Sequence, residues 1–358
     1  MDFSLTDDQK SLRDLARQII TDAVTPEHLQ QLEKQGWSVF DRPLWQKLAT
    51  AGVTGIAVPE DQGGGGLGFL ELSLVFEEVG RAVAPVPAVP TLVTAYVLGK
   101  HKVATDVLAG AAEGSTILTT AFEGEVLASR DGDDYVLSGE TPFVPYGAEA
   151  DVVVVPATFG EGPIVALVRR GAAALSVTEL ETTNREPQAL LALDGVRVAA
   201  SDVVTNAGDL VSDLRQHMTS ALCSVVAGVC QTALDMTAKH TATREQFGKP
   251  IASFQAVGQR AADAYIDTEM VRLTALQAAW RLSEGWPAAE EVAVAKFWAG
   301  DGGMRALHAC QHLHGGLGVD LDYPLHRYFL WGKQIEHELG TPTRQLLALG
   351  AQLAQTPV

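Results

Sequence analysis

The first part of the chain carries apolar residues at the spacing of amphipathic helices. In the first of these helices they recur at i, i+3 and i+4, at Leu12, Leu15, Ala16, Ile19 and Ile20. Thr6 stands just before this pattern, and two acids follow it, as is typical of a helix N-terminus. Further short helices are predicted within 44–51 and 69–84. We therefore expect an N-terminal helical domain over residues 1–114.

Between residues 115 and 205 the pattern changes to the alternation of β-strands. Candidate strands lie at 116–120, 135–138, 152–155, 164–168, 175–179 and 190–196. The sequence D-G-D-D at 131–134 predicts a hairpin turn. Because no long helical pattern separates the strands, we expect a mostly antiparallel barrel or sandwich over residues 115–205.

The rest of the chain, residues 206–358, is helical again. Long apolar stripes cover residues 214–243, 251–284 and 288–313, and the glycines of H-G-G-L-G at 314–318 end the third. These residues predict a C-terminal four-helix bundle. The fold class is therefore α+β, with a β-domain between two helical domains.

A run of four glycines follows P-E-D-Q at residues 59–62. Such a run could cradle a phosphate, but it lacks the strand-then-helix context of a dinucleotide fingerprint and the lysine of a P-loop. We expect a flexible loop lining a cleft instead.

Composition excludes some function classes. The chain has 358 residues, is 47% hydrophobic and carries a formal net charge of −18, which argues against nucleic-acid binding. Its three cysteines, Cys223, Cys230 and Cys310, lack metal or disulfide spacing. His308, His312 and His314 show no evident further ligand, so no metal site is predicted.

No targeting or membrane segment is predicted. The N-terminus lacks a basic region followed by an apolar core, and no apolar run reaches the roughly 18 residues of a membrane span. We expect a cytoplasmic protein that contacts neither membrane nor nucleic acid.

The stretch T-R-E-Q-F-G-K-P-I-A-S-F-Q at 243–255 joins two long helices, and its glycine and proline predict a sharp corner. It combines the guanidinium of Arg244 with the amides of Gln246 and Gln255 and the aromatic rings of Phe247 and Phe254. An arginine suits a pyrophosphate, and an aromatic face suits a flat heterocycle. The corner is therefore a candidate dinucleotide site, although an ordinary helical hairpin would also explain it.

Four motifs, in order, resemble the acyl-CoA dehydrogenase family over essentially the whole chain. They are the opening M-D-F-S-L-T-D-D-Q-K, then G-I-A-V-P-E-D-Q-G-G-G-G-L-G, F-E-E-V-G-R, and R-E-Q-F-G-K with a downstream H-G-G-L-G. The resemblance implies a flavoprotein that removes hydrogens from Cα and Cβ of an acyl-CoA, with an electron-transfer flavoprotein as the expected acceptor. It also implies that FAD lies between the β-domain and the C-terminal helices and extends to a neighbouring subunit.

The resemblance assigns cofactor-binding roles residue by residue. Arg244 matches the arginine at the FAD pyrophosphate, with Gln246 and Phe247 beside it, and the pair Phe254-Gln255 lines the same cofactor. Downstream, the matching residues are Gly315 and Gly316 at the adenosine half, His312 where the family has glutamine, and Thr341 of the Gly-Thr near the C-terminus.

The family's catalytic base is missing. A glutamate normally precedes that Gly-Thr, but here the position holds Leu339, and Glu338 lies one residue too early, a rotation of about 100° if helical. The alternative position, counted back from Arg244, holds Met218. We therefore predict no catalytic residue in this chain.

The chain also differs from the family in the two motifs that contact the flavin ring. The loop T-E-P-x-x-G-S-D is shortened to Thr119–Gly124, and the motif W-I-T or W-I-S reads Phe143-Val144-Pro145. Proline removes both a hydroxyl and a backbone donor.

Three interpretations follow. The chain could be the shorter, degenerate subunit of a heteromeric (α2β2) acyl-CoA dehydrogenase, resembling actinobacterial members that act on bulky sterol-derived thioesters, with the base supplied by the partner. It could instead be a self-sufficient homo-oligomer that uses Glu338 or another acid, or a non-redox structural or binding protein that kept the fold.

Overall fold

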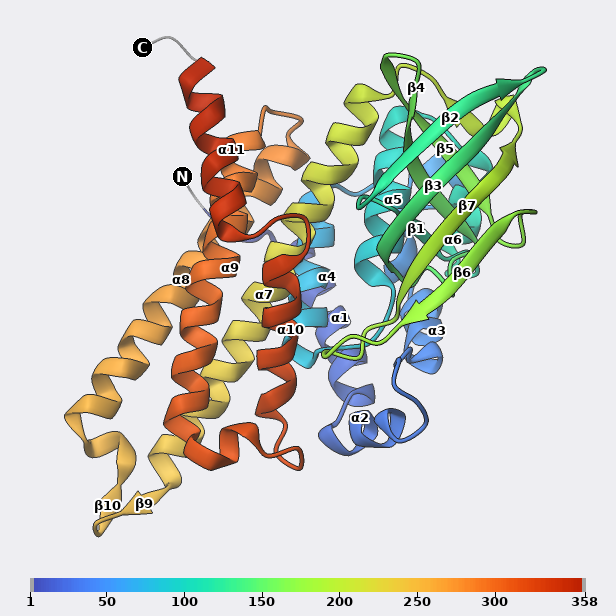
Figure 1. The fold of residues 1–358 in the computed structure, drawn as a ribbon. Helices are drawn as coiled ribbons and strands as arrows, with labels where there is room; N and C mark the ends of the chain where they lie inside the picture. Colours follow the sequence, from blue (N-terminus) through green and yellow to red (C-terminus); the bar gives the residue numbers. More distant parts are fainter. Residues whose placement is uncertain (1–2, 356–358) are drawn as a thin grey trace. The chain divides into compact units, whose positions relative to one another are not determined.

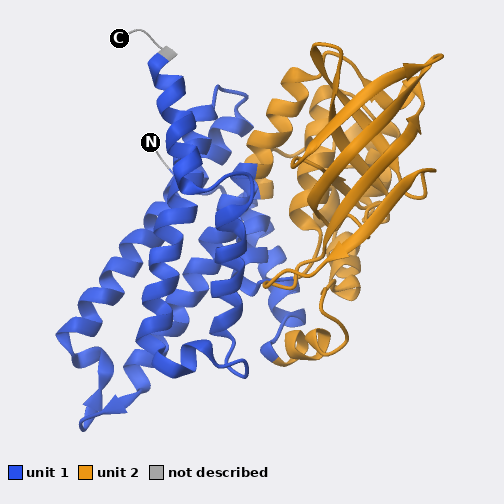
Figure 2. Cartoon of the chain, viewed as in Figure 1, with its two compact units in different colours: residues 1–26, 73–84, 219–358 blue, residues 27–72, 85–218 orange. Residues whose placement is uncertain are grey.

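The computed structural model describes residues 3–355, and its elements follow the predicted order of helices, then strands, then helices (Figure 1). Two compact units are distinguished in Figure 2: residues 1–26, 73–84 and 219–358 form unit 1, and residues 27–72 and 85–218 form unit 2. The predicted domain boundaries after residues 114 and 205 follow the changes of secondary structure and stay a proposal.

Unit 1 is helical. It contains α1 (Asp7–Ala23), most of α4 (Phe69–Ala82) and α7 (Gly208–Thr243), then α8 (Gln255–Ser283), α9 (Ala289–His314), α10 (Leu325–His337) and α11 (Pro342–Gln355), with the hairpin β9 (Glu245–Gln246) and β10 (Lys249–Pro250) and the turns η5 (Ile251–Ser253) and η6 (Gly315–Val319). Thr6 caps α1 as predicted: its hydroxyl accepts the Gln9 N–H at 3.2 Å, and the Gln9 side chain accepts the Thr6 N–H at 3.0 Å.

Glycines let α4 and α7 cross with their backbones in contact. A Cβ on Gly80 would lie 2.0 Å from the Val225 carbonyl oxygen, and a Cβ on Gly228 would lie 1.9 Å from the Glu77 carbonyl oxygen. Because both obstacles are backbone atoms, neither can move aside as a side chain could. On the same stretch of α7, Val226 would lie 2.9 Å from a Cβ on Gly303 of α9. The three helices can pack this closely only because glycine stands at each of these contacts.

Unit 2 contains the β-domain and the helices beside it. The helical elements are α2 (Pro26–Glu33), α3 (Arg42–Thr50), η1 (Val53–Gly55), η2 (Glu60–Gln62), α5 (Ala88–His101), η3 (Thr105–Val107), α6 (Leu108–Ala112) and η4 (Ala200–Asp202). The strands are β1 (Leu118–Thr120), β2 (Glu125–Asp131), β3 (Asp134–Pro145), β4 (Val152–Phe159), β5 (Gly162–Arg169), β6 (Leu175–Leu180), β7 (Gln188–Val198) and β8 (Val203–Val204).

The strands form one mixed sheet in the order β6-β7-β3-β2-β4-β5-β8, with β1 paired to β4. Most neighbours are antiparallel, and the pairs β1–β4 and β2–β4 are parallel. The predicted turn joins β2 to β3, where Asp131 pairs with Asp134 and Gly132 has φ +63°. Apolar side chains such as Tyr135, Leu137 and Val196 form the buried core of the domain.

The alternation pattern does not predict β2, because most of its side chains are exposed, including Glu125 and Asp131. Its position depends on backbone pairing with β3 along its full length. A strand whose residues are mostly polar and exposed leaves no apolar signal in the sequence.

The expectation of a flexible glycine loop is wrong. The amides of Gly64, Gly65 and Gly66 donate to carbonyls of residues 55–59 at 2.9–3.1 Å. A Cβ on Gly64 would lie 2.1 Å from the Val58 carbonyl oxygen. The glycines therefore serve close backbone packing within unit 2.

Helix α7 is long and apolar enough, by length and composition alone, to cross a membrane, a property that the search for an uninterrupted apolar run missed. In its most apolar 18-residue window, 67% is buried inside the structure. Such burial is typical of a core helix.

Substituting Gly228→Ala is expected to lower the free energy of unfolding by about 3 kcal/mol, because the new methyl group would collide with backbone. The matched control is Gly350→Ala on α11, where a Cβ meets nothing within 4 Å and stability should rise by about 0.5 kcal/mol. Urea unfolding followed by circular dichroism measures both. Equal stability of the two variants would show that the α4–α7 crossing relaxes freely.

Candidate functional site

The predicted dinucleotide corner begins directly at the end of α7. The Arg244 N–H donates to the His240 carbonyl at 2.8 Å, and the Ile251 N–H donates to the Arg244 carbonyl at 2.8 Å. Between them β9 and β10 form a two-stranded hairpin, with Phe247 at φ +55° and Gly248 at φ +75° in its turn. The predicted sharp corner is thus a hairpin that ends at α8, whose first residue is Gln255.

The side chains of this corner point away from the body of unit 1. Phe247 is 93% exposed, and Arg244 and Gln246 are also exposed. Phe247 meets Phe254 edge-on at 6.2 Å between ring centroids, and the Lys249 ammonium lies 4.4 Å from the centroid of the Phe254 ring. Within residues 3–355, the Arg244 guanidinium makes no hydrogen bond or ion pair, so its donors are available to an anionic group.

The glycine turn predicted for the adenosine half follows α9. Gly315 has φ +62°, its N–H donates to the His312 carbonyl, and the His312 side chain is exposed. A Cβ on Gly315 or Gly316 would meet nothing within 4 Å in this chain. Packing inside unit 1 therefore does not require glycine at Gly316. The open space, with the cation at Arg244, fits the adenosine and pyrophosphate half of FAD.

Thr341 lies apart from these residues. Figure 1 shows the β9–β10 hairpin and the turn between α9 and α10, which contains η6, at one end of the helices of unit 1. The corner between α10 and α11 packs beside the middle of α9, where a Cβ on Gly300 would lie 2.6 Å from Pro342. Helix α10 alone, Leu325–His337, spans about 20 Å. The structure therefore brings the Arg244 and Gly315 segments to one end and does not bring Thr341 to them.

A buried lysine, which was not predicted from the sequence, bonds the last turn of α10 just before the Thr341 corner. Lys296 of α9 is 1% exposed, and its ammonium donates to the Ile335 carbonyl in the last turn of α10. Burial lowers the pKa of Lys296. A lysine within the apolar stripe of a predicted helix was the available signal.

Glu338, one candidate base, lies close to Lys296 and accepts a hydrogen bond from α10. Gln334 Nε2 donates to Glu338 Oε1 at 2.9 Å. Burial raises the pKa of Glu338, while that hydrogen bond and the charge of Lys296 act in the opposite sense. Its carboxylate is therefore bonded to its own helix, and Leu339, at φ +52°, takes the position where the family has its base.

In unit 2, the threonine hydroxyls at the start of the shortened loop form hydrogen bonds within the unit. Thr119 Oγ1 donates to the Pro145 carbonyl at 2.7 Å, and Thr120 Oγ1 is 3.0 Å from Thr94 Oγ1. Pro145 pairs with Gln188 as a regular residue of β3. The loop between β1 and β2 is reduced to residues 121–124. These residues do not fit an isoalloxazine ring that needs donors from this loop.

The other base position, Met218, is buried, and its neighbour His217 is fully buried as well. His217 Nδ1 donates to the Asp213 carbonyl at 2.7 Å, and its ring meets Phe69 edge-on at 4.8 Å. Its Nε2 has no hydrogen-bond partner among residues 3–355. Burial lowers the pKa of His217 to about 4, so the ring stays neutral.

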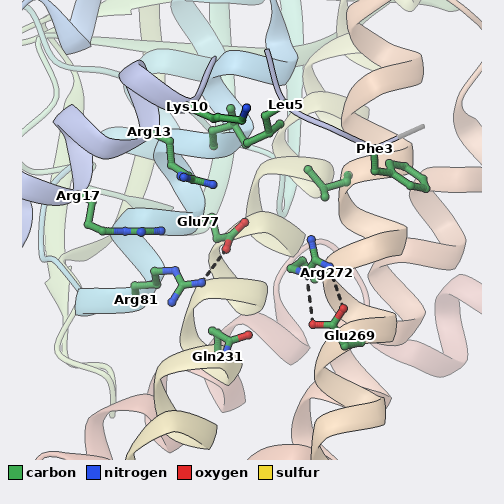
Figure 3. Close-up of a pocket in the computed structure, with 12 residues that line it drawn as sticks. Phe3, Leu5, Lys10, Arg13, Arg17, Glu77, Arg81, Gln231, Glu269 and Arg272 are labelled. Atoms are coloured by element: carbon green, nitrogen blue, oxygen red, sulfur yellow. Dashed lines mark hydrogen bonds and ion pairs between the residues drawn. The ribbon is translucent and has the colours of Figure 1, made fainter. Parts of the chain in front are cut away.

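A cavity of about 420 Å³ lies in unit 1, among α1, α4, α7 and α8 (Figure 3). Its cations are each paired with an acid: Lys10 with Asp7, Arg13 with Asp14, Arg17 with Glu78, Arg81 with Glu77, and Arg272 with Glu269. It contains none of the predicted site residues.

Within the described residues there is no group of three or more His, Cys, Asp or Glu side chains placed to hold a metal.

Replacing Lys296 by methionine should lower the free energy of unfolding by about 2–3 kcal/mol, because it leaves a buried carbonyl and the Glu338 carboxylate without their cation. The control Lys333→Met, which removes an exposed ion pair with Glu336, should cost less than about 1 kcal/mol. Urea unfolding at pH 7.5 compares them, and a Lys296→Met protein as stable as wild type would contradict this role.

His217 should make the protein acid-sensitive. Because its folded pKa of about 4 lies below the ordinary histidine value, stability is full above about pH 6.5 and falls as the pH drops toward 4. The full loss assigned to this ring is about 3 kcal/mol, of which about 2 kcal/mol is reached by pH 5. A His217→Phe variant should lack that component when unfolding is measured at pH 7.5 and pH 5. An unchanged pH dependence would show that folding does not lower the pKa of this ring.

Comparison with known proteins agrees with the geometry. Residues 6–115 match the family described as acyl-CoA dehydrogenase, N-terminal domain, and residues 216–354 match its C-terminal domain. Acyl-CoA dehydrogenase FadE27 from Mycobacterium tuberculosis is 41% identical over 374 residues, covering 100% of both chains.

Solved structures are similar over the same length. A chain of the ChsE4–ChsE5 complex from Mycobacterium tuberculosis is 42% identical, with a TM-score of 0.95 and 100% of both chains covered. A chain from a variant of the Tcur3481–Tcur3483 steroid ACAD is 41% identical, with a TM-score of 0.91 and 98% of each chain covered. The chain therefore belongs to the acyl-CoA dehydrogenase family, whose members are FAD-dependent oxidoreductases.

Proposed function

We propose that this chain is one subunit of a heteromeric acyl-CoA dehydrogenase and lends its exposed corner to FAD seated mainly in a partner chain. The observation that carries the proposal is a contrast between the residues expected at the pyrophosphate and adenosine and those expected at the flavin ring. The groups suited to the pyrophosphate and adenosine are exposed and free of intrachain bonds. The threonine hydroxyls at the start of the shortened loop are already bonded inside unit 2.

The roles of the chain's own residues follow from their chemistry. Arg244 would donate to the pyrophosphate, Gln246 and Gln255 would donate to polar groups of the cofactor, and Phe247 and Phe254 would shield it from water. The backbone at Gly315 and Gly316 would approach the adenosine closely, with His312 beside it. When bound, FAD supplies the acceptor for the hydride that leaves Cβ of the acyl-CoA.

The partner would supply the base that removes the Cα proton, since Leu339 and Met218 cannot accept a proton. Thr341, in the corner between α10 and α11, would contact a second cofactor or none. The relatives support a partner, because one similar chain comes from a complex of two differently named proteins. Another is described as a steroid ACAD, which supports a bulky sterol-derived acyl-CoA as substrate. Electron-transfer flavoprotein as acceptor and a cytoplasmic location complete the proposal.

One observation favours a second candidate, a self-sufficient homo-oligomer. Burial raises the pKa of Glu338, as a general base for an α-proton requires. Against it, the carboxylate is bonded to Gln334 and lies one residue before the expected position.

The deciding experiment is the visible absorption spectrum of the purified chain, expressed alone and with the acyl-CoA dehydrogenase gene encoded beside it. Flavin bands near roughly 370 and 450 nm should appear only after co-expression. Stoichiometric flavin in the chain alone, with turnover of an acyl-CoA, would favour the homo-oligomer. Absence of flavin in both preparations would favour a non-redox protein.

Replacing Arg244 by glutamine in the complex should raise the Kd for FAD about 30-fold, the effect of losing about 2 kcal/mol of charge-assisted hydrogen bonding. The control Arg130→Gln removes an exposed arginine that stacks on Tyr135 in unit 2 and should leave the Kd unchanged. Fluorescence titration with FAD measures both. Equal affinities of the Arg244 variant and wild type would contradict the assigned role.

A further inference from the structure

Two histidines stack where the segments of the corner meet. The rings of His240 and His314 lie 4.4 Å apart between centroids, at an interplanar angle of 19°. His240 is in the last turn of α7, and His314 is the last residue of α9. The sequence did not predict that these two rings stack.

The hydrogen bonds of His314 define its neutral form. The ring is 6% exposed, and its Nδ1 donates to the Cys310 carbonyl at 2.8 Å. Its Nε2 is 3.1 Å from the Tyr323 hydroxyl and, in this tautomer, accepts its proton. A proton on Nε2 would reverse that hydrogen bond and place a charge in a buried site.

The stack connects segments that carry the expected FAD contacts. The His240 carbonyl accepts the N–H of Arg244, so movement of His240 moves the base of the hairpin. Gly315 directly follows His314, and Tyr323 comes just before α10. The spacing between Arg244 and the Gly315-Gly316 turn therefore depends on the contact between the two rings.

The surroundings of the rings oppose a positive charge. Among residues 3–355, the titratable and charged groups that act on them are Arg244 beside His240, and Tyr323 and His240 beside His314. Burial lowers the pKa of both rings, and Arg244 lowers that of His240 further. The hydrogen bond to the Cys310 carbonyl raises the pKa of His314 in part, and His240 lowers it. Protonation of both would place two like charges face to face.

We infer that the stacked pair of His240 and His314 positions the FAD-binding corner only while both rings are neutral, so that the complex releases FAD in mildly acidic solution. The inference rests on the proposed function, because it assumes that this corner contacts FAD. Both histidines are positioning residues: they hold Arg244 and the glycine turn at their working distance.

The direction of the pH dependence follows from linkage. When the corner opens, the rings recover an ordinary histidine pKa of about 6.5, so protons favour the open form. Affinity for FAD should be constant above about pH 7 and fall below about pH 6.5. If an imidazolium contacted the pyrophosphate instead, affinity would rise in acid.

The test uses the complex with its partner chain and measures the Kd for FAD by fluorescence titration at pH 8 and pH 5.5. For wild type we expect the Kd to rise several-fold in acid, because the open form binds protons more readily than the closed form. The double variant His240→Phe/His314→Phe keeps stacked rings without titrating nitrogens, so its Kd should be independent of pH. His240→Phe alone retains the His314 nitrogens and should show a smaller rise in Kd than wild type. The control His308→Phe alters an exposed histidine of α9 and should behave as wild type.

A second readout needs no cofactor. In the FAD-free complex labelled with ¹³C at histidine Cε1, the signals of His240 and His314 should titrate below the ordinary range, and His240→Phe should raise the pKa of His314. Because His240 is only half-buried, its phenylalanine variant tests the inference even if the double variant does not fold.

The experiments distinguish failure of the proposed function from failure of the role given to the stacked pair. If Arg244→Gln leaves FAD binding unchanged, the proposed function fails. If Arg244→Gln weakens binding while His240→Phe keeps the wild-type pH dependence, only the role of the stacked pair is overturned. Tighter binding of FAD at pH 5.5 would also overturn it.

Discussion

The close crossing of α4 and α7 is the constraint on which unit 1 depends. At Gly80 and Gly228 the two backbones leave no room for a Cβ, and Gly303 brings α9 onto the same stretch of α7. From that crossing, α7 runs on to His240 and Arg244, and α9 runs on to His314 and Gly315. A rigid crossing is what allows two helix ends to present fixed groups to a ligand outside the chain.

The same chain treats the two halves of a dinucleotide site in opposite ways. At the helix ends, Arg244, Phe247 and Gly316 form few contacts within the chain, although exposing an aromatic ring to water costs stability. In the β-domain, the hydroxyl of Thr119 is bonded to the Pro145 carbonyl, and that of Thr120 is bonded to the Thr94 hydroxyl. Polar groups that are bonded inside a fold cannot also bind a cofactor without leaving a buried partner unsatisfied.

Local signals in the sequence predict much of this structure. The helical period, the Thr6 cap and the D-G-D-D turn depend on residues close together in the chain, so they could be predicted. The position of β2, the close packing of Gly64, the burial of Lys296 and the stacking of His240 on His314 depend on residues far apart in the chain. The sequence shows the corner's chemistry, but not that the length of α10 separates Thr341 from the Gly315 turn.

The most direct test of the central claim is the amount of FAD bound by the purified complex, measured from flavin absorbance against the concentration of each chain. Because this chain lacks the groups for a flavin ring of its own, the account predicts one FAD for each pair of unlike chains. One FAD for every chain would contradict it, since the β-domain of this chain would then hold a ring despite its bonded hydroxyls.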